Sequence, residues 1–103
     1  MEVIGREQNR FVILRRGGGG GGVPMIFKVP PDQEKAFKRI APHVTNDQFG
    51  LAARNADPDG HSTIRGIPLG NHTAAIGIAR SSYTSRGVKQ EAYKITFLRE
   101  VRN

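Results

Sequence analysis

The chain has 103 residues, and its 16 Lys and Arg against 9 Asp and Glu give a formal net charge of +7. This length predicts one domain, and the lack of cysteine excludes disulfides, thiolate catalysis and cysteine-based zinc sites. The sequence contains no apolar run long enough to span a membrane and no secretory signal pattern, so we expect an intracellular protein, cytoplasmic or nuclear, without membrane contact.

Six consecutive glycines at 17–22 divide the sequence. Such a tract has no side chains to pack and much backbone entropy to lose, so we expect a flexible linker. It separates an N-terminal β-hairpin at 1–16 from a main α+β domain at 23–103, on which the hairpin must dock. A circular permutation or an engineered fusion would produce this layout by joining former termini, and a natural low-complexity tract is the alternative.

The most regular helical pattern lies at about 31–41. Pro31 suits a first helical turn, and Asp32 and Glu34 complement the positive end of the helix dipole. Phe37 and Ile40 belong to one apolar stripe with helical spacing. The sequence therefore predicts an amphipathic helix that buries one face.

Residues 45–56 carry two conflicting signals. Thr45 and Gln48 match a capping box before helically spaced apolar residues, whereas Gly50 weakens a helix. The turn sequence at 57–60 would also suit the connection of a β-hairpin. We favour the hairpin for this segment.

Beyond this turn the sequence predicts two further strands, separated by a polar loop at 80–89. In the strand at 73–80, large apolar side chains alternate with small ones, and the small face would let another backbone approach closely. In the strand at 93–101, we expect Tyr93, Ile95, Phe97 and Val101 on one face and Lys94, Thr96 and Glu100 on the other. The resulting fold class is α+β, a mainly antiparallel sheet with one amphipathic helix packed on one face.

The charge pattern favours nucleic acid as the partner, either single-stranded DNA or RNA. No Asp or Glu occurs from 60 to 90, and the loop at 80–89 combines cations and hydroxyl groups with one tyrosine. Cations and hydroxyls bind phosphate oxygens, and an aromatic ring can stack on an unpaired base. The predicted contact residues are Arg15, Arg16, Arg65, Arg80, Tyr83, Arg86, Lys89 and Lys94.

Two other functions stay open on the sequence. A protein-binding module or inhibitor could present the same loop to an acidic protein, which the cations would attract. A small metal-independent ribonuclease could use His61, Arg65 and Tyr83, although no second base is paired with the histidine. Nothing in the pattern indicates a cofactor or a metal site, and association into a homodimer would stabilise a domain this small.

Overall fold

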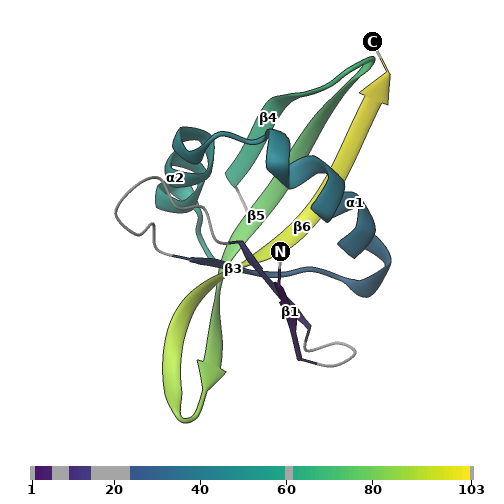
Figure 1. Cartoon of the computed structure of the whole chain (residues 1–103). Coiled ribbons are helices and arrows are strands. Elements are labelled where there is room, and N and C mark those ends of the chain that lie inside the picture. The colour runs from purple at the N-terminus through teal and green to yellow at the C-terminus, as the bar shows by residue number, and fades with distance from the viewer. Residues whose placement is uncertain (1, 6–9, 15–23, 60–61, 103) are drawn as a thin grey trace.

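The computed structural model describes residues 2–5, 10–14, 24–59 and 62–102. Its strands form one six-stranded sheet in the order β1-β2-β3-β6-β5-β4 (Figure 1). Neighbouring strands are antiparallel except β3 and β6, which are parallel, so the predicted α+β class is confirmed and the sheet is mixed. The strands are β1 (Glu2–Ile4), β2 (Phe11–Leu14), β3 (Met25–Lys28), β4 (Ser62–Leu69), β5 (His72–Ser85) and β6 (Val88–Arg102).

The predicted helix at 31–41 forms as three consecutive pieces. A 3-10 turn, η2 (Pro31–Gln33), leads into α1 (Glu34–Ile40), and a second 3-10 turn, η3 (Ala41–His43), ends the segment. Phe37 and Ile40 are fully buried, as the apolar stripe predicts.

The hairpin expected at 45–56 is wrong, because this segment forms the helix α2 (Asn46–Asn55). The Thr45 hydroxyl accepts a hydrogen bond from the Gln48 backbone N–H, and the Gln48 side chain accepts one from the Thr45 backbone N–H. This complete capping box and the burial of Phe49 outweigh the cost of about 1 kcal/mol that Gly50 brings to a helix.

Both α-helices pack on the same face of the sheet and bury the main core there (Figure 1). Phe27 of β3 lies at its centre, with ring centroids 5.1 Å from Phe37, 5.6 Å from Phe49 and 5.9 Å from Tyr93. One side chain from each helix and one from β6 therefore meet on a single ring.

The strands β1 and β2 join the sheet through the antiparallel pairing of β2 with β3. A second, smaller apolar cluster forms around Ile13, Ile26 and Ala92. The glycine tract at 17–22 lies outside the described residues, so the proposed linker, the domain division and the permutation or fusion stay predictions.

An ion-pair cluster connects the segment before β2 to the start of α1. The Glu34 carboxylate accepts a hydrogen bond from Arg10 at 2.8 Å and lies 3.2 Å from the Lys38 ammonium. Burial alone would raise the pKa of Glu34, but hydrogen bonds from Lys38 and Arg10 outweigh it and lower this pKa below the ordinary value of 4.5.

We expect Glu34 to stabilise the fold above its unfolded-state pKa, because its folded-state pKa is the lower of the two. This contribution should disappear as the pH falls below 4.5 and through the folded-state value. Urea unfolding from about pH 6 to about pH 3 checks this. The Glu34→Gln variant should be less stable by about 1–2 kcal/mol near neutral pH and should converge on the parent chain in acid. A constant difference across the pH series would contradict this role.

The polar loop predicted at 80–89 is also wrong, because β5 and β6 continue through it as a two-stranded arm (Figure 1). The arm closes between Ser85 and Val88, and the two residues between them have positive φ angles, 52° at Arg86 and 76° at Gly87. Two left-handed residues in succession make a two-residue turn whose twist matches the flanking strands. Continuous cross-strand pairing therefore replaces the expected loop.

A β-bulge in β6 changes which side chains face the helices. Gly77 pairs with Phe97 and Ile78 pairs with Ile95, so Thr96 is an extra residue in β6. An inserted residue moves every later side chain to the opposite face. Tyr93 and Ile95 remain on the helix-covered face as predicted, but the expected placement of Phe97, Val101 and Glu100 is reversed.

Candidate nucleic-acid interface

The face of β4, β5 and β6 that no described helix covers contains a shallow hollow of about 220 Å³. Its floor is formed by the small side chains of β5, which include Ala75 and Thr73. Arg65 of β4 and Arg99 of β6 line it from the two neighbouring strands, and Phe97 lines it from β6. We call the surface formed by Thr63, Arg65, Thr73, Ala75, Lys94, Phe97 and Arg99 the basic sheet face.

Gly77 determines where the Phe97 ring lies. A methyl group at this position would overlap the Phe97 ring and the Thr96 hydroxyl. Because Gly77 has no side chain, the Phe97 ring packs directly against β5, where it is half-buried and keeps part of its surface open to solvent. The Arg99 guanidinium carbon stands 5.3 Å from the centroid of this ring, within the range of a cation–π contact.

The two arginines flank the hollow at a separation set by the sheet. Ala75 is the cross-strand partner of Arg99, and β4 lies on the other side of β5. Arg65 and Arg99 therefore originate two strand spacings apart, roughly 10 Å. Lys94, the cross-strand partner of Ala79, adds a third cation further along the same face.

The described carboxylates that form ion pairs lie elsewhere. Glu100 faces the helices, where it pairs with Arg39 and lies 3.9 Å from His72. The hydrogen bond from Arg39 lowers the pKa of Glu100, and Glu100 in turn raises the pKa of Arg39. Glu34 likewise forms ion pairs with Arg10 and Lys38. Among the described residues, no Asp or Glu lines the hollow, so no described carboxylate compensates the charge of its arginines there.

The structure separates the predicted contact residues into several places. Arg65 and Lys94 belong to the basic sheet face. Arg15, Arg16 and His61, the last of which the ribonuclease hypothesis requires, lie outside the described residues. The remaining four lie on the arm, and they are Arg80, Tyr83, Arg86 and Lys89.

The arm residues do not form the single open cluster that the sequence predicts. The Arg80 guanidinium is 3.4 Å from the Glu91 carboxylate, so its charge is partly compensated. The Tyr83 ring is half-buried, with its centroid 4.8 Å from that of Phe11, whereas Lys89 is exposed and Arg86 forms the tip. Tyr83 is therefore a packing residue in this structure, whereas Phe97 lies beside cations for which the described residues supply no carboxylate partner.

Sequence reasoning misses Phe97 and Arg99 because it does not foresee the bulge that exposes them. The sequence alone does not reveal it, because Ile95, Phe97 and Leu98 are all apolar; it is the structure that packs Ile95 and Leu98 on the main core although they lie three residues apart. A regular strand places such a pair on opposite faces, so the spacing indicates an inserted residue.

No family model, curated protein or solved structure that we compared matches the chain. Within the described part of the chain, no three His, Asp or Glu side chains are close enough together to hold a metal ion. None of its described helices is long and apolar enough to cross a membrane.

Proposed function

We propose that this chain binds single-stranded nucleic acid on the basic sheet face, as a binding protein without catalytic chemistry. The observation that carries the proposal is a half-buried phenylalanine between cations on a sheet face where no described carboxylate lines the hollow. Phosphates are attracted by the arginines, and an unpaired base can stack on the Phe97 ring. The net charge of +7 strengthens this attraction at long range.

A single strand fits this surface better than a duplex. The Phe97 ring packs against β5 at Gly77 within a shallow hollow, so a base must be unpaired to reach the ring. The described helices lie on the opposite face, and each mixes charges: α1 carries Glu34 among its cations, and α2 carries Asp47 as well as Arg54, so neither offers a uniformly basic helix for a groove. The exposed Arg86 at the tip extends the proposed contact along the arm, whereas the register puts Lys89, the cross-strand partner of Thr84, on the side opposite to Lys94.

The test is fluorescence anisotropy with labelled single-stranded RNA, single-stranded DNA and duplex across a salt series. Single strands should bind more tightly than duplex, and the logarithm of the binding constant should fall linearly with the logarithm of the salt concentration. The Phe97→Leu variant should lose about tenfold in single-strand affinity, because leucine fills space without a π-face, and should change duplex binding little. Phe11→Leu, which alters a half-buried ring outside the hollow, is the matched control.

Equal losses in the two variants, or equal effects on single strand and duplex, would remove the stacking role of Phe97. Affinity for a folded acidic protein at a salt concentration that abolishes oligonucleotide binding would instead identify a protein-binding module. RNA cleavage that disappears in a His61→Ala variant would identify a ribonuclease.

A further inference from the structure

Two lysines lie side by side on the open face of the sheet, where β3 and β6 pair in parallel. Lys28 of β3 is the register partner of Lys94 of β6, and we call these two residues the lysine pair. The preceding partners, Phe27 and Tyr93, pack on the main core, so both lysines face away from the helices. Neighbouring strands are about 4.8 Å apart, which places two positive charges next to each other.

No described carboxylate compensates the lysine pair. The next partners across the sheet are Phe11 of β2, beside Lys28, and Ala79 of β5, beside Lys94, and both are uncharged. Among the described residues, neither lysine forms an ion pair. Like charges at paired positions of neighbouring strands repel each other, so an anion that contacts both lysines would relieve this repulsion.

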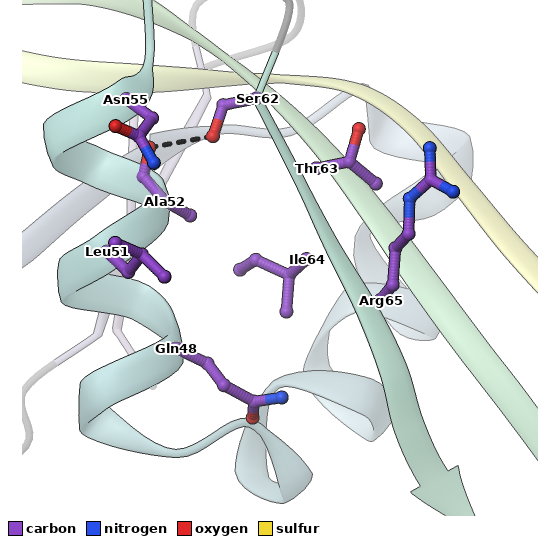
Figure 2. A pocket seen from close by; sticks show the side chains of 8 residues that line it. All are labelled: Gln48, Leu51, Ala52, Asn55, Ser62, Thr63, Ile64 and Arg65. Carbon is purple, nitrogen blue, oxygen red and sulfur yellow. Dashed lines mark hydrogen bonds between the residues drawn. The ribbon is translucent and has the colours of Figure 1, made fainter.

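The lysine pair lies at one end of the proposed binding surface, and the arginines of the hollow lie at the other. Along β6, the Phe97 ring comes between Lys94 and Arg99. Beyond Arg65 the sheet ends at β4, where Figure 2 shows Arg65 pointing away from the side chains of α2. The groove of about 470 Å³ between α2 and β4 has no other charged side chain among its lining residues, so a nucleic-acid strand can leave the surface over this edge.

Beyond the lysine pair, in the opposite direction, the open face becomes apolar. The smaller apolar cluster lies there, formed by Ile13, Ile26 and Ala92 with Phe11 and Tyr83 packed against it. The described side chains of this cluster include no cation that could receive a further phosphate. A strand that reaches the lysine pair from the hollow therefore meets an apolar surface, which suits the end of a strand better than a continuing backbone.

We propose, on the basis of the proposed function, that the lysine pair binds the terminal phosphate of a single strand that has a nearby base stacked on Phe97. A terminal phosphate monoester carries a charge of about −1.5 to −2 at pH 7, whereas an internal diester carries about −1. The monoester therefore compensates both ammonium groups. An internal segment that continues towards Arg86 at the arm tip compensates only one of them.

The experiment compares three oligo(U) strands of equal length with the same internal fluorescent label. One has a 5′-phosphate, one has a 3′-phosphate, and one has hydroxyl groups at both ends. The parent chain should bind at least one phosphorylated strand about fivefold more tightly than the hydroxyl strand at low salt. The phosphorylated end that is preferred gives the direction in which the strand lies on the sheet.

The double variant Lys28→Gln, Lys94→Gln should bind all three strands equally. The matched control is Lys35→Gln, Lys89→Gln, which makes the same chemical change at two exposed lysines outside the open face, one on α1 and one on the other side of the arm. This control should keep the preference, because both double variants lower the formal net charge by two. Thermal unfolding verifies that each variant is folded under the binding conditions.

Equal affinity of the parent chain for all three strands would overturn the role of the lysine pair while leaving the basic sheet face as the binding surface. Loss of the preference in both double variants would also overturn it, because overall charge would then explain the preference. Absence of binding to every strand would overturn the proposed function and the terminal-phosphate site together.

Discussion

Replacement of Phe27 by alanine should destabilise the fold more than replacement of Phe11, a half-buried ring of the smaller apolar cluster, by alanine. The side chain is fully buried (0% exposed) and contacts aromatic rings from both helices and from β6. Loss of a core phenylalanine costs about 3–5 kcal/mol, and each aromatic pair adds about 0.5–1.5 kcal/mol beyond area burial. Small domains have only about 5–15 kcal/mol of stability, so this variant should lose most of its folded population at moderate temperature.

Urea or thermal unfolding, followed by far-ultraviolet circular dichroism, measures this loss. Phe11→Ala is the comparison, because Phe11 is only half-buried and packs on the smaller cluster beside Tyr83. It should cost about 1–2 kcal/mol, and Phe27→Leu, which keeps most of the volume, should cost about 1–1.5 kcal/mol. Equal losses for Phe11→Ala and Phe27→Ala would contradict the central place of Phe27 in the core.

The parts of the fold that the sequence predicts well are those set by local chemistry. Pro31 and the apolar spacing around Phe37 locate the first helix, and the apolar run Phe11–Leu14 locates a strand. The second helix is not predicted, although Thr45 and Gln48 mark its start. Here the capping box outweighs the penalty that Gly50 brings to a helix. The helix and strand propensities of the residues alone do not decide between a helix and a hairpin.

Other features depend on partners distant in the sequence. Polar residues at 80–89 form strands because β5 and β6 pair with each other over their whole length, which no local pattern reveals. The bulge at Thr96 depends on the register with Gly77, and it decides that Phe97 and Arg99 face away from the helices. Arg65 and Lys94 could therefore be predicted from charge, whereas the aromatic residue between them could not.

The same register connects the fold to the proposed interface. Glu100 lies on the helix-covered face and pairs with Arg39, whereas Arg99, its neighbour in sequence, lies on the open face. Because side chains alternate along a strand, the Glu100 carboxylate and the Arg99 guanidinium lie on opposite faces. Among the described residues, Arg99 therefore has no carboxylate partner. If β6 lacked its extra residue, these two charges would exchange faces. The bulge therefore places Arg99 on the basic sheet face and keeps Glu100 off it.

Removal of both arginines of the hollow should have the largest effect on binding. We expect the double variant Arg65→Gln, Arg99→Gln to weaken binding to single-stranded nucleic acid by about 30- to 100-fold at low salt. The loss should be similar for all base sequences, because phosphate contacts carry no sequence information. The slope of the salt dependence should become flatter by about two units, one for each lost phosphate contact.

Net charge alone is controlled by a second double variant, Lys35→Gln, Arg54→Gln. Both residues are exposed on the helices, so this variant also lowers the formal net charge of +7 by two without touching the hollow. It should weaken binding by less than about threefold, because charges beyond about 10 Å are largely screened at ordinary salt concentrations. Similar losses in the two double variants would mean that the chain attracts nucleic acid by its overall charge. In that case the hollow between Arg65 and Arg99 would have no special part in binding.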